Sequence, residues 1–132
     1  MSKPNPADRK YTKEHEWAKD NGNGTITMGI TDHAQELLTD IVFVELPPVG
    51  KKVKQMQPLA VVESVKSVSD VYSPVSGEVL EVNSVLEAHP ELVNQDAFGE
   101  GWIAKLKMDD PGELMNLMDA AGYEDMVRED KH

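Results

Sequence analysis

The sequence predicts a mainly β protein, a small sandwich or barrel with short helices at its periphery. Three observations support this class. Most apolar residues fall in short β-branched runs, glycine- or proline-containing turns separate these runs, and the apolar spacing becomes helical after Pro111. With 132 residues, the chain is long enough to bury a core as one domain.

The first half of the chain is expected to contain a hairpin, a short helix and a further strand. Residues 25–30 follow a turn-prone stretch at 21–24, which predicts a hairpin with the segment around 16–18. A threonine–aspartate pair then starts a run of apolar residues at helical spacing, so a helix is predicted over residues 32–38. Residues 41–46 are β-branched and aromatic, and a proline pair ends this predicted strand.

The second half adds a hairpin with a lysine at its apex. Strands are predicted over residues 58–65 and 67–73, which places Lys66 in the turn between them. Residues 78–83 predict another strand. In residues 102–108 apolar side chains alternate with lysines, which indicates a half-buried strand.

A C-terminal helix is predicted after Pro111. Leu114, Leu117 and Met118 repeat at the i, i+3, i+4 spacing of one helix face, and Gly122 follows near the expected end.

The composition limits the partners of this protein. Thirteen basic residues against 24 acidic ones give a net charge of −11, which argues against nucleic acid or an anionic membrane as partner. No segment approaches the length of a membrane span. The start of the sequence lacks the apolar run of a signal peptide, so a prokaryotic cytoplasmic location is expected. A processed mitochondrial chain would look the same.

No catalytic apparatus is visible in the sequence. The chain has no cysteine, no G-x-S-x-G nucleophile motif and no glycine-rich phosphate loop. His15 and His33 lie near acidic residues, but neither group supplies the three or four ligands of a metal site, so no metal is expected. On residue type alone, Lys66 is interpreted as a solvated turn lysine.

The neighbours of Lys66 support a different interpretation. A lysine at a hairpin tip followed by Ser-Pro-Val-Ser-Gly-Glu-Val (73–79) resembles the lipoyl and biotinyl carrier domains. A wider set of runs narrows this to the H-protein family of the glycine cleavage system, over roughly residues 11–125. The matching runs are residues 11–12, 14–17, 29–35, 40–44, 46–47, 49–50, 63–66 and 101–102. The chain departs from the family pattern at Ser67, where alanine is usual, at Thr39, and at residues 97–98.

The resemblance implies a fold and a cofactor. The fold is expected to be a lipoyl-domain-like flattened barrel or sandwich of two antiparallel sheets, with one domain over residues 1–132 and flexible ends at 1–10 and 128–132. Lys66 is expected to carry lipoate in amide linkage, and Glu63, Ser64 and Val65 are expected to be recognised by the lipoylating enzymes. The protein would be a non-catalytic carrier.

The resemblance also implies partners. The expected ones are the pyridoxal-phosphate-dependent glycine decarboxylase (P protein), the tetrahydrofolate-dependent aminomethyltransferase (T protein) and dihydrolipoamide dehydrogenase (L protein). A monomer that carries the aminomethyl group of glycine from the first to the second is expected, with the third reoxidising the lipoyl group. Glu16 and Asp70 are candidates for sheltering the loaded arm. Two alternatives stay open: a lipoyl-carrier paralogue for lipoate relay or another complex, and an interaction module whose Lys66 is never acylated.

Overall fold

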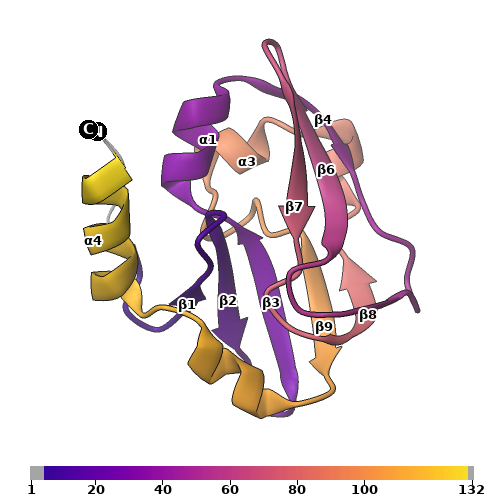
Figure 1. Ribbon diagram of the computed structural model, residues 1–132. Coiled ribbons are helices and arrows are strands. Elements are labelled where there is room, and N and C mark those ends of the chain that lie inside the picture. The colour runs from indigo at the N-terminus through magenta and orange to yellow at the C-terminus, as the bar shows by residue number, and fades with distance from the viewer. Residues whose placement is uncertain (1–4, 131–132) are drawn as a thin grey trace.

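The computed structural model describes residues 5–130, whose strands form two antiparallel sheets (Figure 1). The order is β1-β2-β3-β9-β8-β5 in the six-stranded sheet and β4-β6-β7 in the three-stranded sheet. The strands are β1 (Lys10–Tyr11), β2 (Glu16–Asp20), β3 (Thr25–Ile30), β4 (Ile41–Glu45), β5 (Lys52–Val53), β6 (Pro58–Ser64), β7 (Val68–Tyr72), β8 (Gly77–Val82) and β9 (Ala104–Met108). The helices are α1 (Asp32–Leu38), α2 (Val85–Ala88), α3 (Leu92–Gln95) and α4 (Ala120–Asp130), with a 3₁₀ helix at Pro111–Asn116. The predicted mainly β class is confirmed, as a sandwich of two sheets and not as a closed barrel.

The predicted first hairpin is confirmed as β2 and β3. Trp17 lies opposite Gly29 and Ala18 opposite Met28. The indole of Trp17 fills the space beside Gly29, where a Cβ atom would lie 2.9 Å from the ring. Because real Cβ atoms do not approach this closely, glycine at this position allows the tryptophan to lie flat against the sheet.

The core lies between the two sheets. The six-stranded sheet contributes Ile26, Met28 and Leu106, and the three-stranded sheet contributes Val62 and Val71, all fully buried. Alternate residues of a strand face opposite sides, so each strand presents every second side chain to this core.

A second cluster covers the outer side of β2. Tyr11 stacks on Tyr123 of α4 with ring centroids 5.0 Å apart, and Trp17 is buried in the same cluster. The guanidinium of Arg9 lies 4.4 Å above the Trp17 ring. As a result, the first three residues of β2 are buried on both faces of the strand.

The predicted C-terminal helix is present, but its position was wrong. Residues 111–116 form a 3₁₀ helix, and α4 starts only at Ala120. Between them, the backbone of Met118 exchanges two hydrogen bonds of 2.8 Å with Tyr11. This strand-like pairing uses the backbone N–H and carbonyl groups of Met118, which a continuous helix would have bonded internally. Gly122 lies inside α4, and its N–H donates to the Asp119 side chain.

The positions of the helices and strands do not test two predictions, the flexibility of the chain ends and the number of domains. Of the stretches expected to be flexible, residues 1–4 and 131–132 lie outside the described residues, and for the remainder flexibility stays a prediction. The assignment of residues 1–132 to a single lipoyl-carrier domain likewise stays a prediction. Within residues 5–130, no helix has the length and apolar character needed to cross a membrane.

Candidate functional site

Lys66 lies in the turn between β6 and β7, as the sequence predicts, and its side chain is exposed. In Figure 1 this hairpin extends beyond the neighbouring elements at the top of the molecule, and the turn is its outermost part. A lysine in this position is accessible from several directions. Its ammonium group is solvated and needs no partner inside the protein.

The side chain of Ser64 organises the turn around Lys66. Its hydroxyl oxygen accepts hydrogen bonds from the backbone N–H of Lys66 at 3.3 Å and of Ser67 at 3.1 Å. The backbone N–H of Ser64 donates to the Ser67 carbonyl oxygen at 2.8 Å, and the Ser64 hydroxyl also donates to that oxygen at 3.2 Å. Serine often stabilises turns in this way. The lysine is therefore presented on an ordered turn.

Asn94 of α3 holds the segment around Asp40, which contacts the same turn. The backbone N–H of Val65 donates to the Asp40 carbonyl oxygen at 3.1 Å. On either side of Asp40, the Asn94 side chain accepts from the N–H of Ile41 at 2.9 Å and donates to the carbonyl oxygen of Thr39 at 2.8 Å. Sequence reasoning missed Asn94, because it is distant in sequence from Lys66 and lies in no recognisable motif.

The three residues predicted to be recognised by the lipoylating enzymes have different environments. Glu63 and Val65 are exposed, with Val65 at 66%, whereas Ser64 is 6% exposed. An enzyme can contact the first two directly. Ser64 can act only through the turn that it holds.

A cavity of about 270 Å³ lies beside the hairpin and brings Glu16 and Asp70 together. Strand β7 forms one wall, and apolar residues of α1 and β3 form much of the rest. The lining residues are Glu14, His15, Glu16, Ile30, Ala34, Leu37, Leu38, Val62, Ser69, Asp70 and Val71. The two residues predicted to shelter a bound arm therefore share one cavity, although they are far apart in the sequence.

The two carboxylates differ in their surroundings. Asp70 is exposed, whereas Glu16 is 1% exposed. Glu16 accepts from the hydroxyl of Thr12 at 2.5 Å and from the backbone N–H of Tyr72 at 3.0 Å, so it links the two sheets. Burial raises the pKa of Glu16 to about 7; both hydrogen bonds lower it, and the nearby charge of Glu14 raises it.

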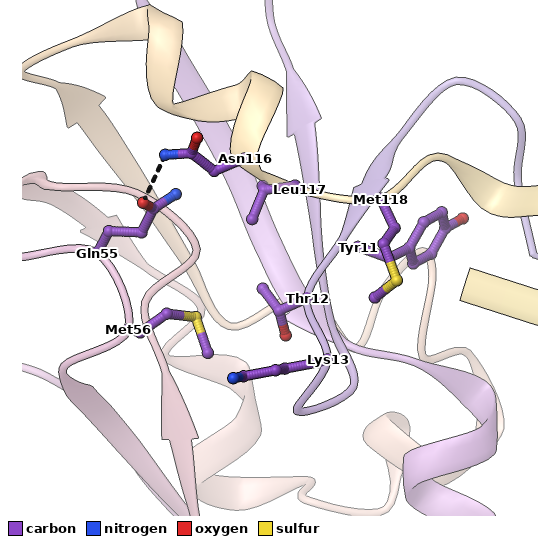
Figure 2. A pocket seen from close by; sticks show the side chains of 8 residues that line it. All are labelled: Tyr11, Thr12, Lys13, Gln55, Met56, Asn116, Leu117 and Met118. Carbon is purple, nitrogen blue, oxygen red and sulfur yellow. Dashed lines mark hydrogen bonds between the residues drawn. The ribbon is translucent and has the colours of Figure 1, made fainter. Parts of the chain in front are cut away.

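A larger cavity, of about 470 Å³, includes no residue of β6 or β7 (Figure 2). Its lining residues are Tyr11, Thr12, Lys13, Gln55, Met56, Asn116, Leu117 and Met118. Polar groups of Gln55 are already paired, since its side-chain oxygen accepts from Asn116 at 3.1 Å and its amide donates to two backbone carbonyl oxygens. The shape of this cavity identifies no ligand. Among residues 5–130, no group of three or more His, Asp or Glu side chains is placed to hold a metal ion.

Comparison with known proteins decides the family. The model of the family described as "Glycine cleavage H-protein" matches residues 9–130. This chain belongs to the glycine cleavage H-protein family. The family supplies the lipoyl-carrier component of the glycine cleavage system, and membership of that system implies partner enzymes.

Individual relatives agree with this assignment over nearly the whole chain. The glycine cleavage system H protein of Aeromonas hydrophila is 56% identical over 125 residues, covering 95% of this chain and 97% of the relative. That of Thermus thermophilus is 57% identical over 122 residues, covering 92% and 94%. The crystal structure of a glycine cleavage system H protein from Mycobacterium marinum matches with a TM-score of 0.85 at 36% identity, covering 94% of this chain and 99% of that one.

The residues around the hairpin fit a lipoyl group. Lys66 offers an exposed amine on an ordered turn, and the adjacent cavity has apolar walls from Ile30, Leu37 and Leu38. The hydrocarbon part of such a group is favoured against these apolar walls.

Proposed function

We propose that this protein carries lipoate in amide linkage on Lys66 and presents it in turn to the enzymes of the glycine cleavage system. The observation that carries the proposal is the position of Lys66, exposed at the end of a projecting hairpin and held by the Ser64 turn. A lysyl-lipoyl arm reaches roughly 14 Å, counting covalent bonds. Tethering keeps the cofactor at a high local concentration wherever the protein docks.

The proposed partners are the decarboxylase (P protein), the aminomethyltransferase (T protein), the dehydrogenase (L protein) and the lipoylating enzymes. Lys66 would hold the lipoyl group and the Ser64 turn would present it; when bound, the group would supply a disulfide able to take up a one-carbon unit on sulfur and to be reoxidised afterwards. The chain itself supplies the tether, the turn and the cavity, without a catalytic group. A monomer in the bacterial cytoplasm is the proposed form, and its net charge of −11 favours partners with basic docking faces.

The cavity beside β7 is proposed to shelter the carried group from water. Asp70 lies four residues after Lys66, at most about 13 Å along a strand, so an arm from Lys66 can reach it. Each Glu16 carboxylate oxygen already accepts one hydrogen bond, but a carboxylate oxygen can accept two. Glu16 can therefore receive a hydrogen bond from an ammonium group at the end of the arm, and the charge of Asp70, which also lines the cavity, favours the same group.

Intact-mass measurement tests the attachment. Protein incubated with a lipoylating enzyme, lipoate and ATP should gain one lipoyl group, on the peptide containing Lys66. Lys66→Arg should abolish the gain without unfolding the protein, because an exposed turn tolerates this change. The matched control Lys54→Arg, at another exposed lysine, should be lipoylated normally. A lipoyl group on another lysine would contradict the assignment.

Turnover with purified partners tests the role. Lipoylated protein should support exchange of the glycine carboxyl group with carbon dioxide by the decarboxylase. Lipoylated protein that the decarboxylase ignores would support the lipoate-relay alternative.

The lifetime of the carried aminomethyl group tests the shelter. Glu16→Ala and Asp70→Ala should shorten it while loading still occurs, and unfolding in urea should shorten it further. Wild-type lifetimes in both variants would show that these residues do not protect the group.

A further inference from the structure

A tyrosine of the C-terminal helix contacts the wall of the cavity beside β7 without lining it. In Figure 1, α4 lies on the side of the molecule away from the β6–β7 hairpin. Its Tyr123 is 0% exposed, and the hydroxyl oxygen lies 2.7 Å from Nδ1 of His15, a lining residue, and 2.8 Å from the hydroxyl oxygen of Thr31. Thr31 is the N-cap of α1, and Ala34 of this helix also lines the cavity. The end of the chain therefore reaches the cavity through the Tyr123 hydroxyl.

The direction of these hydrogen bonds follows from the burial of Thr31. The Thr31 hydroxyl oxygen accepts from the backbone N–H of Ala34 at 3.1 Å, and its own proton needs an acceptor because the side chain is 0% exposed. Among residues 5–130, the acceptor within its reach is the Tyr123 oxygen. Burial raises the pKa of Tyr123 to about 12, so this hydroxyl keeps its proton at neutral pH and donates it to Nδ1 of His15. The proton of neutral His15 then lies on Nε2.

The backbone of His15 is strained. Its φ is 73°, in the left-handed region that residues other than glycine seldom adopt. Its N–H donates to the Thr12 carbonyl oxygen at 3.2 Å, and its own carbonyl oxygen accepts from the N–H of Thr31 at 3.0 Å. Strain of this kind persists where the surrounding structure imposes it, and it is concentrated at ligand and active sites. The observation is independent of the hydrogen bond to Tyr123 and points to the same residue.

The ring of His15 shares the cavity with three carboxylates. It lies against two other rings, with centroids 5.0 Å from His33 and 5.7 Å from Tyr123, and the cavity is also lined by Glu14, Glu16 and Asp70. A histidine whose ring turned over, or whose proton moved to the other nitrogen, would exchange a donor for an acceptor at this wall. Fixing the ring therefore determines which groups of His15 can donate near the carboxylates.

We propose that Tyr123 is a positioning residue of the cavity beside β7: its hydroxyl fixes the orientation and the tautomer of His15, and thereby sets how well the cavity shelters the carried group. This inference rests on the proposed function. Tyr123 acts through His15, and no bond is made or broken. The ring of Tyr123 has a separate structural role, since it stacks on Tyr11 with centroids 5.0 Å apart. Tyr123→Phe removes the hydroxyl and keeps the stacked ring.

Nitrogen-15 NMR of the unmodified protein tests the tautomer. At about pH 8, above the ordinary titration range of histidine, wild-type His15 should carry its proton on Nε2. Tyr123→Phe should populate the other tautomer, because Nδ1 has lost its donor. A wild-type protein with the proton on Nδ1 would overturn the inference, and so would unchanged His15 signals in Tyr123→Phe.

The lifetime of the carried aminomethyl group tests the consequence. Tyr123→Phe should shorten it roughly three- to tenfold, the range that the loss of one hydrogen bond corresponds to. The matched control is Tyr11→Phe, which removes another buried phenol hydroxyl from the same stack, one that donates to the Pro6 carbonyl oxygen at 2.5 Å. The control should keep the wild-type tautomer and lifetime. A wild-type lifetime in Tyr123→Phe, or equal shortening in the control, would contradict the proposal.

A double variant tests whether Tyr123 acts through His15. His15→Asn removes the ring and places asparagine, which tolerates the left-handed backbone, at this position. Adding Tyr123→Phe to His15→Asn should shorten the lifetime by less than Tyr123→Phe does alone. Fully additive effects would show that the hydroxyl acts elsewhere, and the inference would be wrong. The proposed function fails separately, if the wild-type protein gains no lipoyl group at Lys66; the tautomer, measured on unmodified protein, does not depend on that result.

Discussion

The β2–β3 and β6–β7 hairpins are built alike but are covered differently. In β2 the neighbouring residues Trp17 and Ala18 are each 1% exposed, so both faces of the first half of the strand are buried. In β7, Val71 is 1% and Val68 65% exposed, so only the inner face contributes to the core. A hairpin that is covered on both sides contributes mainly to stability. A hairpin that is open on its outer side and projects at its tip can present a lysine to other proteins, while its inner face packs against the core.

This comparison predicts the largest loss of stability at Trp17. Trp17→Ala should lower the free energy of unfolding by about 3–5 kcal/mol, because it removes a buried indole and its hydrogen bond of 3.0 Å to the Ala97 carbonyl oxygen. Urea unfolding followed by circular dichroism measures the change. A loss below about 1 kcal/mol would show that β2 does not depend on its outer cover.

The next effect concerns Glu16, which joins the two sheets. Its pKa is about 7 in the folded protein, compared with 4.5 as the ordinary value. The folded state therefore holds this proton more tightly, and the resulting stabilisation is fully present below about pH 4.5 and is lost as the pH rises through about 7. The full loss should be on the order of 3 kcal/mol.

Glu16→Gln should remove this part of the pH dependence. Unfolding free energies at pH 5 and pH 8 should differ less in the variant than in the wild type. All other side chains are the same in the two proteins, so the comparison isolates Glu16. The control Glu45→Gln, an exposed carboxylate on β4, should keep the wild-type dependence. An unchanged slope in Glu16→Gln would contradict the prediction.

A smaller and local effect is expected at the tip of the β6–β7 hairpin. Ser64→Ala should cost about 0.5–1.5 kcal/mol and should speed amide hydrogen exchange at Lys66 and Ser67, whose N–H groups lose their acceptor. Ser64→Thr keeps the hydroxyl and should restore slow exchange. Ser67→Ala is the matched control, and it should leave exchange at Lys66 unchanged. Equal exchange in Ser64→Ala and the wild type would mean that the turn does not need the hydroxyl.

The smallest effect sharpens the contrast with Trp17. Val68→Ala on the open face of β7 should change the free energy of unfolding by less than about 0.5 kcal/mol, since the side chain is mostly solvated. The same urea titrations measure it. A loss of 2 kcal/mol or more, a value on the order expected for a buried valine, would mean that this face is covered in solution.

Much of the fold could be predicted because its signals are local. The turn-prone residues 21–24 and the strands beside them produced the β2–β3 hairpin, and the threonine before Asp32 does cap α1, accepting from the N–H of Ala34 at 3.1 Å. The alternation of apolar residues and lysines in β9 appears in the structure as buried Ala104, Leu106 and Met108. Each of these features depends on residues close together in the chain.

The C-terminal helix shows where local signals fail. Leu114, Leu117 and Met118 have helical spacing, yet the backbone at Met118 pairs with Tyr11, more than one hundred residues earlier. The spacing of apolar residues indicates which side chains become buried. It does not indicate which backbone groups form hydrogen bonds with each other. The short helices α2 and α3 were also missed, because four-residue helices carry too little periodicity to be recognised.

The sequence by itself determined that Lys66 stands in a turn between two strands, and its motifs determined the family. The tertiary structure alone brought Asn94 to the segment that contacts that turn, joined Glu16 and Asp70 at one cavity, and aligned Phe43 with Glu63 and Val68. A turn is specified by the conformational preferences of adjacent residues. A cavity or a face depends on the packing of strands whose order and register are decided by burial of the whole core.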